Sequence, residues 1–251
     1  MARIFVTGSA DGLGLGLAQR LVSDGHEVVL HARSERRAQD IAGVGAATLV
    51  GDLSRTDEVR ALAASAGKFD VVVHNAGIGY TASKRQETTD GLEQHFAVNV
   101  LAPYLLTALM PRPARLIYLS SGMHQSGRTT LDDPQWTSRR WNGSAAYSDT
   151  KLWDVVLACA VARRWPGVLA NAVDPGWIAT RMGGRGAPGG LDEGTATQAW
   201  LATSDDPAAR VTGRYFYHRR EQQPAPATQQ QALQDELLDH CASLTGVPFP
   251  A

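Results

Sequence analysis

The sequence has few cysteines, no excess of charge and no long apolar run. Cys159 and Cys241 are the only cysteines, and they are too far apart in the chain to suggest a metal site or a disulfide. Cys159 lies in an apolar helical run, where a buried thiol is expected. The formal net charge of −1 and the lack of a basic tail argue against a nucleic-acid partner. No stretch is long and apolar enough to span a bilayer, and no signal-peptide pattern opens the chain. We therefore expect a cytoplasmic protein.

The sequence also lacks internal repeats and low-complexity domains, and its composition is that of a globular protein. Its 251 residues are 43% hydrophobic and 20% charged. Short β-branched and aromatic runs alternate with helical runs, which predicts an α/β fold with a parallel, doubly wound sheet of about seven strands. The expected strands cover residues 3–7, 27–31, 46–50, 70–74, 115–120, 168–173 and 214–217. We expect one catalytic domain at 1–220, followed at 221–251 by a solvated connector and a helix that packs on it or against another subunit.

A glycine-rich segment follows the first expected strand directly. Gly8, Gly12 and Gly14 lie between that strand and a helical run at 15–23. In this context Gly8 permits a tight turn, Gly12 lets backbone amides approach a pyrophosphate, and Gly14 allows close packing of helix and strand. An ordinary βα turn is the alternative. The order of strand, glycine-rich turn and helix favours a dinucleotide site.

The end of the second expected strand indicates which dinucleotide binds. An acidic residue there would accept hydrogen bonds from the adenosine ribose, but the chain has Arg33 and Ser34 instead. Arg33 can pair with a 2′-phosphate through its planar guanidinium, and Ser34 can add a hydroxyl. Arg36 and Arg37 fit better as solvent-exposed side chains at the start of a helix. The sequence therefore predicts NADP rather than NAD.

Small and polar residues follow the next two expected strands. Asp52 and Leu53 come after the third strand, where Asp52 could accept from an adenine amino group or cap the following helix. Asn75, Ala76 and Gly77 follow the fourth strand and allow close backbone approach to a ligand. Because the carboxyl ends of parallel strands lie at one edge of a sheet, these residues and the glycine-rich turn are expected to share one ligand site.

Tyr147 and Lys151 form the best candidate for acid–base chemistry. They are four residues apart, so on a helix their side chains lie on one face. A free phenol has a pKa of about 10, and lowering it to about 7 requires roughly 4 kcal/mol. One cation about 4 Å away at an effective dielectric of about 20 supplies that much. We therefore expect Lys151 to lower the pKa of Tyr147, although the same spacing also arises by chance on solvated helices.

Taken together, these motifs resemble the short-chain dehydrogenase/reductase family, whose fold is a Rossmann fold. The resemblance covers about the first 220 residues, and the matching motifs occur in family order. They are Thr7-Gly8-x-x-x-Gly12-x-Gly14, Asn75-Ala76-Gly77, Asn99, Ser121, Tyr147-x-x-x-Lys151 and Pro175-Gly176. His74 departs from the pattern, because the family often has Asn at this position.

The resemblance implies roles for four catalytic residues. Tyr147 resembles the general acid in reduction and the base in oxidation, and Lys151 is similar to the residue that holds the nicotinamide ribose and lowers the tyrosine pKa. Ser121 resembles the hydroxyl that orients the substrate carbonyl, with Ser120 as the alternative. Asn99 resembles the residue that bends its helix and positions a water in a proton relay. These roles match a reaction that leaves charge on an oxygen, which donors stabilise and an acid neutralises.

The resemblance also implies the remaining contacts of the cofactor. Backbone near Ile178 and the hydroxyl of Thr180 are expected to hold the nicotinamide carboxamide, close to Pro175 and Gly176. The complete set expected to bind NADP is Gly8, Ser9, Asp11, Gly12, Leu13, Arg33, Ser34, Asp52, Leu53, Asn75, Ala76, Gly77, Tyr147, Lys151, Pro175, Gly176, Ile178 and Thr180. No metal is expected.

The link between Ser121 and Tyr147 is unusually long and resembles that of the retinol dehydrogenase and protochlorophyllide reductase branch. With residues 78–90 and 177–190 it is expected to form an apolar pocket for a bulky or ring-bearing carbonyl. The glycine-rich stretch 182–190 has the composition of a mobile lid. The candidate substrate contacts are Tyr80, Met123, Trp136, Trp141, Trp177 and Met182. For the tryptophans, anchoring of the loops is an equal alternative, and His124 is expected to be incidental.

The sequence thus predicts an NADP(H)-dependent oxidoreductase that reduces a ketone or aldehyde, or oxidises the matching secondary alcohol. Its partner is a small molecule, and a homo-oligomer is possible. A non-catalytic dinucleotide sensor is one alternative, disfavoured by the presence of all four catalytic residues. A sugar-nucleotide epimerase or dehydratase is another, for which the chain has little room after residue 220.

Overall fold

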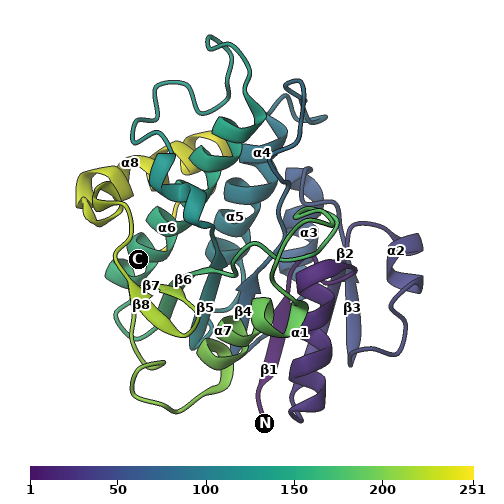
Figure 1. Cartoon of the computed structure of the whole chain (residues 1–251). Coiled ribbons are helices and arrows are strands. Elements are labelled where there is room, and N and C mark those ends of the chain that lie inside the picture. Colours follow the sequence, from purple (N-terminus) through teal and green to yellow (C-terminus); the bar gives the residue numbers. More distant parts are fainter.

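Eight strands form one sheet in the computed structural model, which describes residues 1–251 (Figure 1). They are β1 (Arg3–Val6), β2 (Glu27–Ala32), β3 (Ala47–Val50), β4 (Val71–His74), β5 (Arg115–Leu119), β6 (Leu169–Asp174), β7 (Tyr215–Tyr217) and β8 (Arg220–Gln222). Their order in the sheet is β3-β2-β1-β4-β5-β6-β7-β8, and every neighbouring pair is parallel except β7 and β8. The strand order reverses between β1 and β4, where such sheets bind ligands. The predicted α/β fold with a mostly parallel sheet is confirmed.

Helices cover both faces of this sheet (Figure 1). They are α1 (Gly12–Ser23), α2 (Glu35–Gln39), α3 (Thr56–Ser65), α4 (Gln94–Phe96), α5 (Ala102–Leu109), α6 (Gly143–Arg164), α7 (Leu191–Thr203) and α8 (Gln231–Thr245). A π-helical turn, η1 (Ala97–Leu101), joins α4 to α5, and two 3₁₀ turns are η2 (Gly122–Ser126) and η3 (Pro226–Gln229). Helices α1 and α7 pack together on one face, while α3, α5 and α6 cover the other.

The alternation of side chains along the strands gives each face its own core. Ile4 and Val6 join the core beneath α1 and α7, whereas Phe5 between them joins the larger core beneath α3, α5 and α6. The same alternation places Val72 opposite its neighbours in β4. The central strands are therefore buried on both faces, as their continuous apolar sequences predict. None of the helices combines the length and apolar character needed to cross a membrane.

The segment 221–231, expected as a solvated connector, is mostly exposed but contains two ordered elements. Arg220–Gln222 pairs antiparallel with β7, and η3 forms a helical turn with Thr228 buried. The hairpin turn uses His218 and Arg219, with φ angles of 50° and 59°. Residues at these positions are usually Gly, Asn or Asp, so the sequence lacked the usual hairpin signal. Beyond this hairpin, α8 packs against α6 and buries Leu237 in the larger core.

His74 at the end of β4 is fully buried. We therefore expect the protein to lose stability in mild acid. Its Nε2 shares a hydrogen bond of 3.0 Å with the Thr107 hydroxyl, and its ring packs on Tyr118. Burial lowers the pKa of His74 to about 3. Because the unfolded state binds this proton below about pH 6.5 and the folded state does not, stability is lost as the pH falls from about 6.5 toward 3.

We therefore expect the free energy of unfolding to drop by about 2 kcal/mol per such group between pH 6.5 and pH 5. Urea unfolding of the wild type and of His74→Asn, followed at several pH values, measures this loss. The Asn variant removes one titrating group. Its unfolding should therefore take up fewer protons, by up to about one, and its free energy of unfolding should fall less steeply with decreasing pH. Parallel curves for the two proteins would contradict a neutral buried His74.

Candidate active site

The glycine-rich turn between β1 and α1 is pressed against the end of β4. Gly8 has φ of +62°, and a Cβ there would lie 2.8 Å from the Cα of Ala76. A Cβ at Gly14 would lie 2.4 Å from both the Asn75 Nδ2 and the Gly8 carbonyl oxygen. No other residue fits these two positions without moving the backbone. The turn thus presents its backbone and the N-terminus of α1 at the switch point of the sheet.

Side chains from β1 and β4 hold this turn in place. The Thr7 hydroxyl accepts hydrogen bonds of 3.0 Å from the backbone N–H groups of Asn75 and Ala76. Asn75 Nδ2 in turn donates to the carbonyl oxygens of Thr7 and Gly8. The side-chain amide of Asn75 therefore holds the glycine-rich turn, and Asn75 also lines the cleft described below.

His31 also positions the turn, and the sequence analysis missed it. Gly8 N–H donates to His31 Nδ1 at 2.9 Å, which leaves Nε2–H to donate to the Gly51 carbonyl oxygen at 2.8 Å. Burial lowers the pKa of His31, which keeps the neutral ring that can accept at Nδ1. The single histidine thereby ties the ends of β1, β2 and β3 together. A histidine before the arginine motif was the only available signal, and its partners become visible only in the fold.

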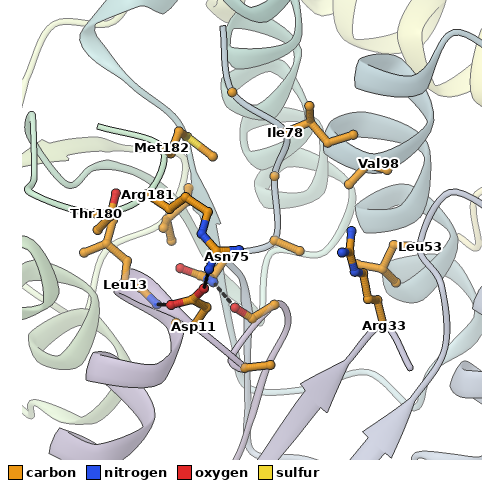
Figure 2. Close-up of a pocket in the computed structure, with 18 of the residues that line it drawn as sticks. Asp11, Leu13, Arg33, Leu53, Asn75, Ile78, Val98, Thr180, Arg181 and Met182 are labelled. Carbon is orange, nitrogen blue, oxygen red and sulfur yellow. Dashed lines mark hydrogen bonds and ion pairs between the residues drawn. The ribbon is translucent and has the colours of Figure 1, made fainter. Parts of the chain in front are cut away.

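A cleft of about 570 Å³ runs along this edge of the sheet (Figure 2). Of the predicted residues it is lined by Gly8, Asp11, Gly12, Leu13, Arg33, Asp52, Leu53, Asn75, Ala76, Gly77, Tyr147, Lys151, Pro175, Thr180 and Met182. It is also lined by Ser120, the alternative to Ser121, and by residues not predicted, among them Ile78, Val98 and Arg181. One cleft thus contains predicted cofactor residues, the Tyr147–Lys151 pair and one predicted substrate contact.

Several predicted residues lie outside the lining of the cleft: Ser9, Ser34, Asn99, Ser121, Gly176, Ile178, Tyr80, Met123, Trp136, Trp141 and Trp177. Ser9 is fully buried, and its hydroxyl donates to the Val6 carbonyl oxygen and accepts from His31 N–H. Ser34 caps α2 with its hydroxyl, at the long distance of 3.5 Å from Arg37 N–H. Both hydroxyls are therefore engaged by the protein itself.

Two arginines that follow β2 line the cleft, and they differ in their contacts with the protein. Arg37 is held by the protein, because it donates to the Ala10 carbonyl oxygen and pairs with Asp11 and Asp40. Arg33 is exposed and makes no hydrogen bond or ion pair, and Figure 2 shows its guanidinium pointing into the cleft. Together with the space that the glycine-rich turn leaves, this free cation fits an anionic dinucleotide.

Tyr147 and Lys151 lie on α6 and face the same cleft. The side chain of Asn142 caps the start of this helix by accepting from Ala145 N–H at 3.0 Å. Lys151 Nζ is 5.6 Å from the centroid of the Tyr147 ring, and Tyr147 is only 7% exposed. The ring of Tyr80 meets that of Tyr147 edge-on at 5.7 Å between centroids. The phenol is therefore oriented by an aromatic neighbour as well as by its helix.

Of the two serines after β5, Ser121 is the one beside the phenol. The side chain of Ser121 lies near enough to the phenol to lower the pKa of Tyr147. The hydroxyl of Ser120 points instead to α6 and donates to the carbonyl oxygen of Lys151 at 2.8 Å. His124 fixes this segment, since its ring bonds the Ser121 carbonyl oxygen at 2.7 Å and accepts from Ala225 N–H at 3.1 Å. Ser120 lines the cleft and Ser121 acts on the phenol, so the choice of Ser121 as the hydroxyl that orients the carbonyl stays a prediction.

The expected lowering of the Tyr147 pKa by Lys151 is present, but it is smaller than the effect of burial. Burial raises the pKa of the phenol above its ordinary value and outweighs the opposing effect of Lys151. Asp154 and Asp174 add negative charge nearby and raise it further. The sequence supplied the cation but contained no measure of the burial of the phenol or of the charges around it.

Asn99 lies at the centre of the π-helical turn η1 and fixes the chain after β4. Its Oδ1 accepts from Ile78 N–H at 2.7 Å, and its Nδ2 donates to the Ile78 carbonyl oxygen and to the Thr150 hydroxyl. A Cβ at Gly77 would lie 3.4 Å from Asn99 Oδ1 and 3.6 Å from Lys151 Nζ. Asn99 therefore joins the β4 loop to α6 directly beside Lys151.

The long link between η2 and α6 is held by a buried carboxylate. Asp133 accepts hydrogen bonds from the backbone or hydroxyl groups of Thr137, Ser138 and Arg139. Burial alone would raise the pKa of Asp133, but these hydrogen bonds hold it well below its usual range. Arg139 also stacks on Trp136 and pairs with Asp149 of α6 at 3.2 Å. The link is therefore ordered by its own polar groups.

The tryptophans predicted as substrate contacts divide into two groups. Trp136 packs edge-on against Trp141, whose Nε1–H donates to the Ala82 carbonyl oxygen at 3.0 Å, so these two anchor loops. Trp177 is 58% exposed and donates to the Gly183 carbonyl oxygen, which ties it to the glycine-rich segment. Met182 is 39% exposed and lines the cleft (Figure 2). Of the predicted substrate contacts, Met182 alone lines the cleft, while Tyr80 packs against Tyr147 and Trp177 is tied to the segment that holds Met182.

Comparisons with known proteins agree with this geometry. A family model described as short chain dehydrogenase matches residues 2–188. An uncharacterized oxidoreductase, AN7799 of Emericella nidulans, is 44% identical over all of this chain and 99% of its own length. Human retinol dehydrogenase 13 is 30% identical over 99% of this chain and 86% of its own length. A crystal structure of a protein from Mycobacterium paratuberculosis superposes with a TM-score of 0.86 at 25% identity, covering 100% of this chain and 96% of that one.

Proposed function

This chain belongs to the short chain dehydrogenase family of oxidoreductases, and from that premise we propose that it transfers a hydride between NADP(H) and a carbonyl compound. The substrate class is a bulky hydrophobic or ring-bearing ketone or aldehyde, or the matching secondary alcohol. One observation carries this proposal: the buried phenol of Tyr147, flanked by Lys151 and influenced by Ser121, faces the cleft that begins at the glycine-rich turn.

The bound dinucleotide supplies the hydride for the carbonyl carbon. The chain's own groups act on the carbonyl oxygen. The Ser121 hydroxyl donates a hydrogen bond to that oxygen and orients it, and Tyr147 donates its phenolic proton as negative charge develops there. The raised pKa of Tyr147 supports reduction, because the phenol holds its proton at neutral pH. In oxidation the ionised phenol accepts the alcohol proton.

The cofactor preference follows from charge at the end of β2. Arg33 is a free guanidinium in the lining of the cleft, and β2 ends in His31 and Ala32 without a carboxylate there to accept from ribose hydroxyls. Arg37 and Asp11 are paired with each other at 3.4 Å. These features support NADP over NAD.

The substrate class is supported by the apolar groups beside the phenol. Met182 lines the cleft, Tyr80 packs against Tyr147, and the exposed ring of Trp177 is bonded to Gly183, next to Met182 in the chain. The relative named retinol dehydrogenase 13 carries the name of a bulky apolar alcohol, and it aligns with nearly the whole chain. The cytoplasmic location and the homo-oligomer stay predictions.

A substrate panel tests the proposed function. We expect NADPH consumption with bulky aromatic or polycyclic ketones and aldehydes, and kcat/KM at least about tenfold lower with small charged oxo acids, because each buried apolar group contributes 1–3 kcal/mol. NADPH absorbance follows the reaction, and NADH at the same concentration is the control. A preference for small charged substrates would contradict the apolar pocket. NADPH binding without turnover on any carbonyl would favour a dinucleotide sensor.

A further inference from the structure

The Lys151 ammonium is held between two buried acceptors. Nζ donates to the carbonyl oxygen of Leu119 at the end of β5 and to Asp154 Oδ2, in each case at 2.7 Å. The side chains of Lys151 and Asp154 are 5% and 4% exposed. An ammonium has three donors, and Lys151 still lines the cleft. Two of its three donors are therefore used away from the cleft, and one is left to face it.

Asp154 continues the helical face that carries the two proposed catalytic groups. Tyr147, Lys151 and Asp154 are spaced by four and three residues, so they lie in one row along α6. This row joins a phenol, a cation and a carboxylate in the protein interior. Asp154 forms its one ion pair with Lys151, and a buried carboxylate without such a partner would be strongly disfavoured. The pair therefore acts as a unit.

We propose that Asp154 is a positioning residue that sets the proton affinity of Tyr147 through Lys151. Asp154 fixes the ammonium against β5 and cancels much of its positive charge, so the phenol keeps its proton. The consequence is an enzyme biased toward reduction at neutral pH, the direction in which Tyr147 acts as the acid. The inference rests on the proposed function where it treats Tyr147 as that acid.

The other titratable groups near Tyr147 do not control its pKa in the way proposed for Asp154. Tyr118 from β5 and Tyr215 from β7 have pKa values raised by burial and stay neutral, and burial keeps His74 neutral down to a pKa of about 3. Asp174 at the end of β6 also raises the pKa of Tyr147, but it is only half-buried, where solvent weakens its effect. The pKa of Asp154 itself is raised by burial, against the effect of Lys151, to about 6. Above that pH its carboxylate is charged.

Titration of the phenol in the protein without cofactor tests the proposal. The chain has six tyrosines, so the ultraviolet difference spectrum of each variant is compared with that of the same variant carrying Tyr147→Phe. Asp154→Asn keeps the shape and removes the charge, and we expect the Tyr147 pKa to fall by about one unit or more. Asp154→Glu retains the charge and is expected to restore the wild-type titration to within about 0.3 units.

Asp149→Asn is the matched control, because it removes a buried carboxylate of the same helix that pairs with Arg139 instead of Lys151. We expect it to leave the Tyr147 titration unchanged. Asp154→Ser repeats the charge removal in a smaller side chain if the Asn variant does not fold. A shift of less than about 0.3 units in these neutral variants, or an equal shift in Asp149→Asn, would overturn the proposal.

The pH dependence of turnover gives a second measure. Reduction requires the protonated phenol, so the alkaline fall in kcat should move to lower pH by the same amount in Asp154→Asn, about one unit. Because the spectroscopic titration needs no turnover, it decides the role of Asp154 even if no carbonyl proves to be a substrate. Failure of the proposed function and failure of this inference are thus distinguishable.

Discussion

Replacing Tyr147 with Phe is expected to lower the rate of carbonyl reduction by about 10³-fold, within the range that a positioned general acid contributes. The variant loses only the hydroxyl that meets Ser121, while the ring keeps its contacts with Tyr80 and Lys151. The fold and the glycine-rich turn should therefore be unaffected. NADPH binding, measured by fluorescence titration, is expected to stay within about threefold of wild type, because the phenol is one of many contacts along the cleft.

Tyr80→Phe is the matched control for this loss. It removes the hydroxyl of the neighbouring ring, which packs edge-on against Tyr147 at 5.7 Å, and it should change kcat by less than about tenfold. Retained turnover in Tyr147→Phe would exclude the phenol as the acid. Loss of NADPH binding together with turnover would indicate that the substitution had disturbed the cleft, and the proposed acid would then lack support.

Several parts of the fold were predictable because they depend on local patterns. Alternating apolar runs and helical runs specify a parallel sheet, and the glycines at 8, 12 and 14 specify a tight turn at its edge. The structure gives the reason for two of them, since side chains at Gly8 and Gly14 would collide with Ala76 and Asn75. The hairpin of β7 and β8 was missed because His218 and Arg219 adopt positive φ angles without the residues that usually signal them.

The electrostatics of the candidate site could not be read from the chain. The spacing of Tyr147 and Lys151 correctly places both side chains on one face of α6, yet the pKa of the phenol is raised rather than lowered. The direction of the pKa shift depends on burial and on the charge of Asp154, and sequence spacing alone does not give the size of either effect. His31 and Asp154 were missed for the same reason. The partners of His31, Gly8 and Gly51, become its neighbours only when the sheet has formed, and the burial of Asp154 with Lys151 against the end of β5 likewise appears only in the fold.

The preference for NADPH is expected to depend on Arg33. Arg33→Ala should raise the Kd for NADPH by about 10- to 100-fold, because a hydrogen-bonded ion pair with a phosphate contributes about 1.5–3 kcal/mol. The Kd for NADH should change by less than about threefold, since this cofactor has no 2′-phosphate for the guanidinium to bind. Arg33 is suited to the role because its side chain lines the cleft and has no ion-pair partner in the protein.

The measurement is a pair of fluorescence titrations with NADPH and NADH at fixed ionic strength, because salt screens exposed charges. Arg36→Ala is the matched control: Arg36 lies three residues further along, in α2, is exposed and does not line the cleft, so its loss should alter neither Kd by more than about twofold. Repeating the titrations at higher salt should weaken NADPH binding more in the wild type than in Arg33→Ala. Equal losses of affinity for both cofactors in Arg33→Ala would show that the guanidinium does not read the 2′-phosphate, and the preference for NADP would lose its physical basis.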